Sequence, residues 1–466
     1  MKRKIYLHGM VVFIGVFQFV NAQINTFESK INIMEILENN EPQSCITSEQ
    51  YNFLENQCNK NAQILDLQTT LIPGSVSLSW PLQADTALKD CSYYRISAYV
   101  DQNTTTGNFE DYNCGSNTYD GHKGTDISIW PNNFYKMDNN LVKVIAAASG
   151  IIIDKQDGEF DKNCGSTSAT ANYIVIQHED GSRAIYFHMK KNSLTAKIIG
   201  QSVLSGEFLG IVGSSGNSSG PHLHFEVWSG STVSTRIDPF SGTCNTLNSK
   251  SWWNDQKEYK ESAIVKVSSN TTDIVLPPCP GTETLNESSS FQIPFQGTGL
   301  PAGFAKFYMY IREEIIGLKA EMSILNPDGS NFTNWTYISV TDSKTRIQGY
   351  SKKLPTLAGK YIFKASYNGK SCSTDFEIIN PTKSSSTIVN APINLYPNPS
   401  NGNLRIDFAN HLTLDLIIYN NLGNMVFKSK LIRQTPELNL VLPSGMYMFK
   451  LLHENQIMNT GKLIIE

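Results

Sequence analysis

The sequence predicts a mainly β protein that consists of several antiparallel units in series. Short segments rich in β-branched and aromatic residues recur along the chain, and Gly, Asn, Asp and Ser separate them. Aromatic residues make up 10% of the sequence, which is typical of strand-rich proteins. At 466 residues, the chain is also too long for one hydrophobic core, because single domains contain about 100–200 residues.

The charge balance argues against nucleic acid as a partner. Charged residues account for 17% of the sequence, and the formal net charge is −4. A nucleic-acid-binding protein needs a concentrated positive surface to neutralise phosphates. We therefore expect no nucleic-acid partner, and we expect the protein to be a monomer.

The N-terminal residues have the pattern of a signal peptide. Three basic residues, Lys2 to Lys4, precede an apolar run at Met10–Val20, and small residues follow up to Ala22. We expect residues 1–22 to direct export. No later stretch approaches the roughly 20 continuous apolar residues that a membrane-spanning helix needs, so we expect no membrane span.

The cysteines predict disulfide bonds, because an even number in an exported chain favours pairing. The eight cysteines are Cys45, Cys58, Cys91, Cys114, Cys164, Cys244, Cys279 and Cys372. No Cys-x-x-Cys pair occurs, so the sequence does not support a cysteine zinc site. We expect each bridge to close within its own segment: Cys45 with Cys58, Cys279 with Cys372, Cys114 with Cys164, and Cys91 with Cys244.

Residues 23–70 form a polar, Asn- and Gln-rich N-terminal extension. Apolar residues between Ile31 and Leu37 indicate a possible amphipathic helix. The extension could be a pro-segment or a short extension that packs on the next unit. The packed extension is the simpler interpretation.

Residues 71–245 have the pattern of an antiparallel β unit. The expected strands are Val142–Ala147, Gly150–Ile153, Tyr173–His178, Ala184–Met189 and Leu209–Val212. Five of the eight histidines of the chain lie in this unit: His122, His178, His188, His222 and His224. Imidazoles bind zinc and transfer protons at neutral pH, so their concentration here predicts a functional site.

Two of these histidines are expected to share one face of a strand. Side chains alternate along a strand, so His222 and His224 point the same way, while Leu223 and Phe225 point into the core. The turn at Gly216–Pro221 leads into this strand, and its glycines adopt backbone conformations that other residues resist.

A second motif supplies further donors. Gly121 and Gly124 argue against a helix, so we expect His122 to lie in a tight loop and Asp126 to begin the strand Asp126–Trp130. Nitrogen and oxygen donors at such spacings suit a zinc ion with one open coordination position. His188 is either a site residue or a half-buried strand histidine, and His178 is expected at an exposed hairpin end, outside the site.

Together these motifs resemble the lysostaphin/LytM-type zinc endopeptidases, including the β-lytic enzymes. The motifs are Gly-His122-Lys-Gly-Thr-Asp126, Tyr-Phe-His188-Met, Gly213-Ser-Ser-Gly216 and Gly-Pro-His222-Leu-His224-Phe-Glu226. The resemblance covers residues 71–245. It implies an antiparallel β-sheet core with a groove and the hydrolysis of peptide bonds in peptidoglycan, often in Gly-rich peptides.

The same resemblance implies roles for individual residues. His122, Asp126 and His224 would bind Zn²⁺, and His188 and His222 would be catalytic. His222 would act as general base, while His188 would position the water or stabilise the developing oxyanion. The segments 90–117 and 154–172 are longer than a minimal core of this family requires, and we expect them to wall the groove.

The C-terminal half predicts two further small β-sandwich domains. We expect a linker at 246–282, an immunoglobulin-like or PKD-like sandwich at 283–380, and a Ser-rich linker at 381–392. Residues 393–466 resemble the C-terminal sorting domain of type IX secretion. The resemblance rests on Tyr396-Pro-Asn-Pro399, Leu404–Phe408, Ile417–Gly423, Leu442–Lys450 and Gly461–Ile465. It implies export by the type IX secretion machinery to the medium or the outer cell surface.

Two functions follow as hypotheses. The first is a secreted zinc metalloendopeptidase that cuts peptidoglycan cross-links or Gly-rich peptides. The alternative is a non-catalytic protein that binds the cell wall or mediates adhesion and retains a peptidase fold. The five residues His122, Asp126, His188, His222 and His224 favour the first, because a binding module does not need all of them.

Overall fold

The computed structural model describes residues 46–67, 76–380, 394–407, 413–431, 437–453 and 456–466. Contacts group the chain into two compact units, Met1–Asn380 and Pro381–Glu466. The expected signal peptide at 1–22, the possible helix around residues 31–37 and the linker at 381–392 lie outside the described residues.

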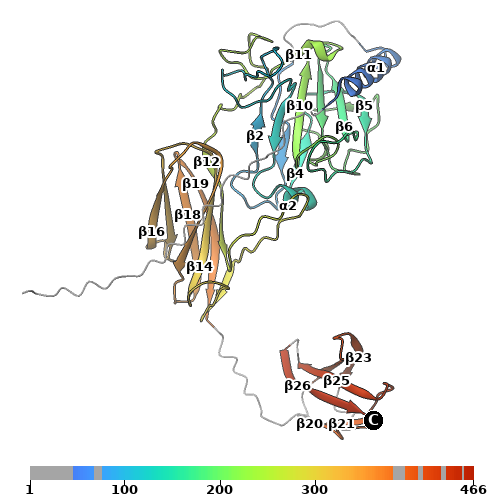
Figure 1. The fold of residues 1–466 in the computed structure, drawn as a ribbon, viewed down its shortest axis with the longest axis vertical. Coiled ribbons are helices and arrows are strands. Elements are labelled where there is room, and N and C mark those ends of the chain that lie inside the picture. The colour runs from blue at the N-terminus through green and yellow to red at the C-terminus, as the bar shows by residue number, and fades with distance from the viewer. Residues whose placement is uncertain (1–45, 68–75, 381–393, 408–412, 432–436, 454–455) are drawn as a thin grey trace, which may run out of the picture. The chain divides into compact units, whose positions relative to one another are not determined.

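The first β region of the first unit contains an eight-stranded sheet in which all neighbouring strands are antiparallel (Figure 1). Its strand order is β2-β3-β10-β7-β6-β5-β8, and β11 pairs with β10. The strands are β2 (Arg95–Ala98), β3 (Thr125–Ser128), β5 (Gly150–Gln156), β6 (Tyr173–Gln177), β7 (Arg183–Phe187), β8 (Ser202–Val203), β10 (His222–Trp228) and β11 (Arg236–Ile237).

A second, three-stranded sheet and three helical segments complete the described residues of this region. The sheet has the order β1-β4-β9, with β1 (Leu82–Ala84), β4 (Val142–Ile145) and β9 (Phe208–Ile211). The helical segments are α1 (Ser48–Ile64), α2 (Asn133–Asp138) and the 3₁₀ helix η1 (Val233–Thr235). Neither described α-helix combines the length and the apolar character needed to cross a bilayer.

The two faces of the large sheet pack against different partners. Leu223, Phe225 and Val227 of β10 belong to one core cluster together with Val144 of β4 and Leu209 of β9. A second apolar cluster lies on the opposite face of the large sheet, because side chains alternate along its strands. There, Tyr51 and Leu54 of α1 pack with Tyr173, Ile185, Phe187 and Trp228. Helix α1 therefore covers the face of β10 from which its even-numbered side chains project.

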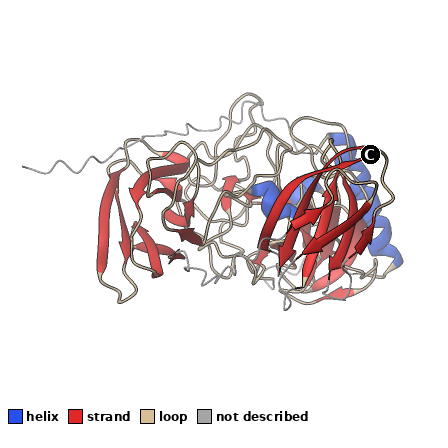
Figure 2. Cartoon of the chain, turned by 90° about the horizontal axis from the view of Figure 1, so that it is seen from below, coloured by secondary structure: helices blue, strands red, loops and turns tan. Residues whose placement is uncertain are grey.

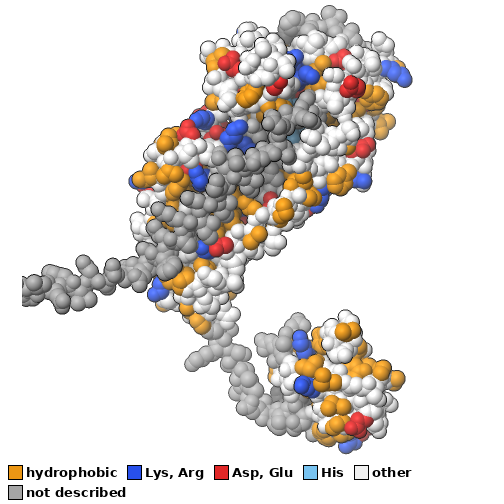
Figure 3. All heavy atoms as spheres, in the orientation of Figure 1, with side chains coloured by type: hydrophobic (Ala, Val, Ile, Leu, Met, Phe, Trp, Pro, Cys, Tyr) orange, Lys and Arg blue, Asp and Glu red, His pale blue; other side chains and the backbone are white. Residues whose placement is uncertain are grey.

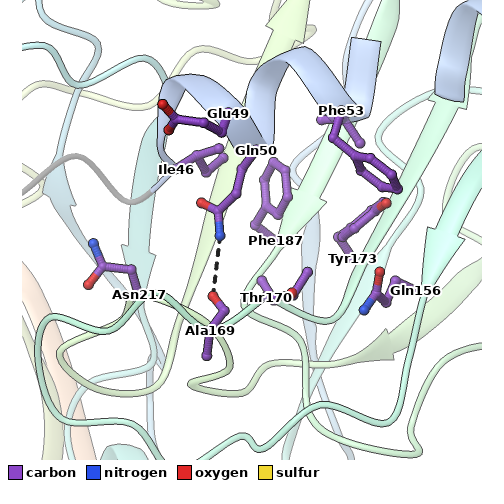
Figure 4. A pocket seen from close by; sticks show the side chains of 12 residues that line it. Ile46, Glu49, Gln50, Phe53, Gln156, Ala169, Thr170, Tyr173, Phe187 and Asn217 are labelled. Carbon is purple, nitrogen blue, oxygen red and sulfur yellow. Dashed lines mark hydrogen bonds between the residues drawn. The ribbon is translucent and has the colours of Figure 1, made fainter. Parts of the chain in front are cut away.

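Helix α1 was not predicted from the sequence. Thr47 and Gln50 form a capping box at its N-terminus, and its buried residues Tyr51, Leu54, Cys58 and Ala62 follow helical spacing. The first turn of α1 lies over a cavity of about 360 Å³ that Phe53, Tyr173 and Phe187 help to line. The amide of Gln50 donates to the carbonyl oxygen of Ala169 across this cavity, at 3.4 Å (Figure 4).

The second β region of this unit is a sandwich of two sheets. One sheet has the order β12-β14-β17, and the other β13-β19-β18-β15-β16. The strands are β12 (Ala263–Asn270), β13 (Ser290–Gln292), β14 (Phe304–Glu314), β15 (Lys319–Leu325), β16 (Asn331–Ile338), β17 (Ser343–Lys353), β18 (Gly359–Tyr367) and β19 (Lys370–Ile379). Strand β12 falls within the segment expected to be a linker, 246–282, so the sandwich begins earlier in the chain than we expected.

The C-terminal unit contains two smaller sheets around its own apolar cluster. They have the orders β20-β21-β24 and β23-β22-β25-β26. The strands are β20 (Asn394–Tyr396), β21 (Asn403–Asp407), β22 (Leu414–Tyr419), β23 (Met425–Leu431), β24 (Glu437–Asn439), β25 (Gly445–His453) and β26 (Gln456–Ile465). Strands thus make up most of the regular structure throughout the described residues, as expected from the sequence (Figure 2).

Charged side chains of both signs are interspersed on the face of the molecule that Figure 3 shows. On the face that Figure 3 shows, Lys and Arg alternate with Asp, Glu and apolar side chains over the described residues.

The disulfides differ from those expected. The bonds are Cys91–Cys372, Cys114–Cys244 and Cys164–Cys279, so the predicted pairs Cys114–Cys164, Cys91–Cys244 and Cys279–Cys372 are wrong. The prediction assumed that each bridge closes within its own segment. Instead, two of the three bonds link the region of the large sheet to residues beyond it. Of the pair Cys45–Cys58, Cys45 lies outside the described residues, and Cys58 is buried and bonded to no other described cysteine.

Backbone contacts explain why Cys91 pairs with the sandwich. The amide of Ser92 donates to the carbonyl oxygen of Val265 in β12, at 3.0 Å. The guanidinium of Arg312 in β14 donates to the carbonyl oxygen of Tyr94, at 2.9 Å. The segment around Cys91 therefore lies against the sandwich, which carries Cys372 on β19.

We predict that Cys372→Ser lowers the free energy of unfolding by about 2–4 kcal/mol, because loss of the bond releases a long closed loop in the unfolded chain. Denaturant unfolding measures this loss. The double variant Cys91→Ser/Cys372→Ser should lose no more than either single variant, since all three lack the same bond. Additive losses, or a tryptic map without a linked Cys91–Cys372 peptide, would contradict the assignment.

Candidate metal centre

Strand β10 lies between β3 and β7, and its register places an acidic residue beside a histidine. His224 is directly opposite Asp126 of β3 and opposite Phe187 of β7. Directly opposite residues of antiparallel strands have Cβ atoms about 4.5–5.5 Å apart. As a result, Nδ1 of His224 lies 2.8 Å from Oδ1 of Asp126. The strand pairing itself thus brings together two residues that are about a hundred positions apart.

The third residue of this group, His122, comes from the loop before β3. Nδ1 of His122 donates to the carbonyl oxygen of Tyr99 at 2.6 Å, which fixes the ring. Nε2 then lies 3.2 Å from Nδ1 of His224 and 3.2 Å from Oδ2 of Asp126. Gly124 allows the loop to lie this close to His224, because a Cβ atom at position 124 would be 2.7 Å from Nε2 of His224.

Donor atoms of His122, Asp126 and His224 all lie within 4.8 Å of one another, and the three residues are buried. Ligands about 2.0–2.1 Å from a tetrahedral zinc ion are roughly 3.3–3.4 Å apart. The separations of 2.8 to 3.2 Å between the donor atoms are close to that spacing. Two imidazoles and one carboxylate are also a typical ligand set of catalytic zinc sites, which keep one position open.

The tautomers support a cation at this position. His122 donates from Nδ1, and Nε2 of His224 donates to Oε1 of Glu226 at 2.8 Å. In the neutral form of each ring, the lone pair is on the nitrogen opposite this donor, which is Nε2 of His122 and Nδ1 of His224, and these two nitrogens lie 3.2 Å apart. In that form, a cation among them would accept both lone pairs. The residues present therefore fit a zinc ion.

Asp126 is in the state that a metal ligand requires. Burial opposes ionisation of its carboxyl, but the neighbouring His122 and His222 outweigh this effect and hold the pKa well below its usual range. Asp126 is therefore an anion at neutral pH.

His188 and His222 lie beside the three donors. Their ring centroids are 4.7 Å apart, and Nε2 of His222 is 3.6 Å from Oδ1 of Asp126. Each ring donates from Nδ1 to a backbone carbonyl oxygen, that of Gly220 at 2.8 Å for His222 and that of Ser215 at 2.6 Å for His188. His188 directly follows β7 and has φ 64°, a left-handed conformation uncommon for a side chain other than glycine.

The structure thus brings together all five residues that the sequence analysis placed in the site. His178 lies elsewhere, as expected, but it is only 3% exposed, so the expectation of an exposed histidine is wrong. Its Nδ1 donates to the carbonyl oxygen of Ser149 at 2.8 Å. Burial lowers the pKa of His178 below its usual value.

Sequence reasoning missed residues that hold the donors in place. Glu226 accepts from His224, and Tyr119 stacks on His122 with ring centroids 4.2 Å apart. Glu226 could have been found, because it follows His224 by two positions and therefore shares its face of the strand. A third residue, Tyr51, contacts Glu226 from α1, and no sequence pattern pointed to this contact.

Comparisons with known proteins agree with this geometry. Residues 120–239 match the profile of "Peptidase family M23", and residues 394–466 match "Secretion system C-terminal sorting domain". These matches confirm both family resemblances identified from the sequence. All five site residues lie within the first match. The sorting domain indicates secretion across the outer membrane.

Two curated relatives and one solved structure illustrate the similarity. An uncharacterized metalloprotease of Haemophilus influenzae is 30% identical over 105 residues, which is 22% of this chain and 18% of the relative. Peptidoglycan DD-endopeptidase ShyA of Vibrio cholerae is 43% identical over 56 residues, which is 12% of each chain. The catalytic domain of lysostaphin from Staphylococcus simulans is 23% identical with a TM-score of 0.21, and the match covers 32% of this chain and 89% of that domain.

The chain thus spans less than a fifth of the length of these two curated relatives. In this chain, residues 120–239 form a domain of peptidase family M23, and residues 394–466 form a secretion system C-terminal sorting domain.

Proposed function

We propose that the protein is a secreted zinc metalloendopeptidase that hydrolyses peptide bonds in peptidoglycan cross-links or Gly-rich peptides. The observation that carries this proposal is the buried group of His122, Asp126 and His224 within the family M23 domain. Their donor atoms, tautomers and charge suit one zinc ion. When bound, zinc polarises the scissile carbonyl and lowers the pKa of water.

The two neighbouring histidines would carry the proton transfers. Because His222 donates from Nδ1 to Gly220, its neutral ring has the lone pair on Nε2, the nitrogen on the side of Asp126. In our proposal this nitrogen accepts a proton from the attacking water, as a general base does. His188, held by Ser215, would position the water or stabilise the negative charge that develops on the carbonyl oxygen.

Peptidoglycan is the substrate class that the relatives favour. ShyA, which is 43% identical over 56 residues, is named a peptidoglycan DD-endopeptidase. The sorting domain would place the enzyme outside the cell through the type IX secretion machinery, where cell walls of other bacteria and Gly-rich extracellular proteins are within reach.

We predict that the purified protein releases new amino groups from cross-linked peptidoglycan. A zinc chelator such as 1,10-phenanthroline should abolish the release, and added zinc should restore it. His178→Ala provides the matched control, because His178 is a buried histidine of the same domain outside the site, and this variant should stay active. A folded, zinc-loaded protein that releases no amino groups from peptidoglycan or from Gly-rich peptides would instead support the non-catalytic, wall-binding function.

We predict different effects for the two histidines of β10. His224→Ala removes one of three donors, so the protein should lose zinc in elemental analysis after dialysis. His222→Ala keeps all three donors and should retain zinc but lose about 10²–10⁴-fold in turnover, the usual contribution of a general base. Equal loss of zinc in both variants would refute this division of roles.

A further inference from the structure

Helix α1 reaches the metal centre through one side chain. Tyr51 projects from the helix to the face of the large sheet that carries His224, Glu226 and Trp228. Its hydroxyl donates a hydrogen bond to Oε1 of Glu226, and its ring centroid lies 6.3 Å from that of Trp228. Tyr51 is only 3% exposed, so this hydrogen bond is shielded from water and cannot readily be replaced by one to solvent.

Glu226 connects Tyr51 to a proposed zinc ligand. Its side chain is fully buried, and such a carboxylate is costly unless hydrogen-bond donors surround it. It has three: Nε2 of His224 and Nε1 of Trp228, each at 2.8 Å, and the hydroxyl of Tyr51. Together they fix the plane of the carboxylate. Nε2 of His224 is hydrogen-bonded to this carboxylate. The orientation of the carboxylate therefore fixes the orientation of the imidazole ring, and with it the direction in which Nδ1 points.

The position of Tyr51 is fixed by the whole of α1. Leu54 and Cys58 of the helix belong to the apolar cluster on the sheet. Polar contacts add to this packing: Glu55 accepts from the amide of Val233 at 2.7 Å, and Asn61 donates to the carbonyl oxygen of Ile153 at 2.8 Å. The helix is thus bound to the sheet along its length and cannot shift without moving Tyr51.

A second contact joins the helix to the loop of another donor. The ammonium of Lys123 lies 4.0 Å above the centre of the Tyr51 ring, within the distance of a cation–π interaction. Lys123 directly follows His122 in the chain. Tyr51 therefore contacts both the partner of His224 and the neighbour of His122.

We propose that Tyr51 is a positioning residue of the metal centre, which acts through Glu226 on His224. Helix α1, which precedes the family M23 match at residues 120–239, is then a permanent part of the functional unit. Proteolytic processing that removed α1 would weaken the centre, so any pro-segment would have to end before Thr47. The inference rests on the proposed function only in requiring that the centre binds zinc.

The test compares Tyr51→Phe with Tyr173→Phe in the full chain. Both changes remove only a hydroxyl, and both tyrosines belong to the same apolar cluster. The hydroxyl of Tyr173 also donates to a buried carboxylate, that of Asp154 at 2.9 Å. Among the described residues, however, no hydrogen bond or ion pair joins Asp154 to a residue of the metal centre. Zinc affinity is measured by competition with a chromophoric chelator, and the Co²⁺-loaded proteins give visible spectra that report ligand geometry.

We expect Tyr51→Phe to weaken zinc binding by about 10-fold, the lower end of the roughly 10–100-fold that loss of an outer hydrogen-bond partner of a ligand costs. Its Co²⁺ spectrum should change, while Tyr173→Phe should match the wild type in both measurements. In the Glu226→Gln background, Tyr51→Phe should have a much smaller effect, because its route to His224 is already altered.

Two results would overturn the inference, and they differ from each other. If the wild type binds zinc and Tyr51→Phe binds it equally well, or loses no more than Tyr173→Phe, Tyr51 contributes only to packing. The proposed function then survives without this inference. If the folded wild type binds no zinc, both are wrong.

Discussion

The alternation of side chains along β10 is the constraint on which the rest of the structure depends. Leu223, Phe225 and Val227 are completely buried on one face, and each contributes about 1.5–3 kcal/mol by its burial. The even-numbered residues on the other face are the two histidines, Glu226 and Trp228. A slip of one residue against β3 or β7 would turn this polar set into the apolar core. The apolar residues of the strand therefore hold the register that aligns His224 with Asp126.

Burial makes the histidines of the site dependent on their hydrogen-bond partners. A buried polar group that loses its partner costs about 1–3 kcal/mol, and more if it is charged. Here the partners are backbone carbonyls for His122, His188 and His222, and a carboxylate for His224. Each bond to a backbone carbonyl also selects one tautomer of the neutral ring. The fold thus determines which nitrogen of each ring faces the centre before any metal binds, and this preorganisation is what a catalytic metal site requires.

The sequence indicated which five residues would lie together because its signals are local. Two histidines two residues apart on a strand must share a face, and the glycines around His122 indicate a loop. The same periodicity could have identified Glu226, which the sequence analysis missed. Long-range features could not be predicted in this way. The pairing of Cys91 with Cys372 depends on how the sandwich packs against the segment around Ser92, and helix α1 depends on a cluster assembled from four strands. The polar, Asn-rich sequence of α1 gives only a weak apolar pattern, so tertiary packing rather than propensity accounts for it.

X-ray absorption spectroscopy at the zinc edge tests the central claim most directly, because multiple scattering from imidazole rings counts the histidines bound to the metal. The account predicts two imidazoles and oxygen ligands in the zinc-loaded protein, and one imidazole fewer if any zinc remains in His224→Ala. The count should stay at two in His222→Ala. A wild-type spectrum with three or four imidazoles, or with sulfur ligands, would contradict a centre formed by His122, Asp126 and His224.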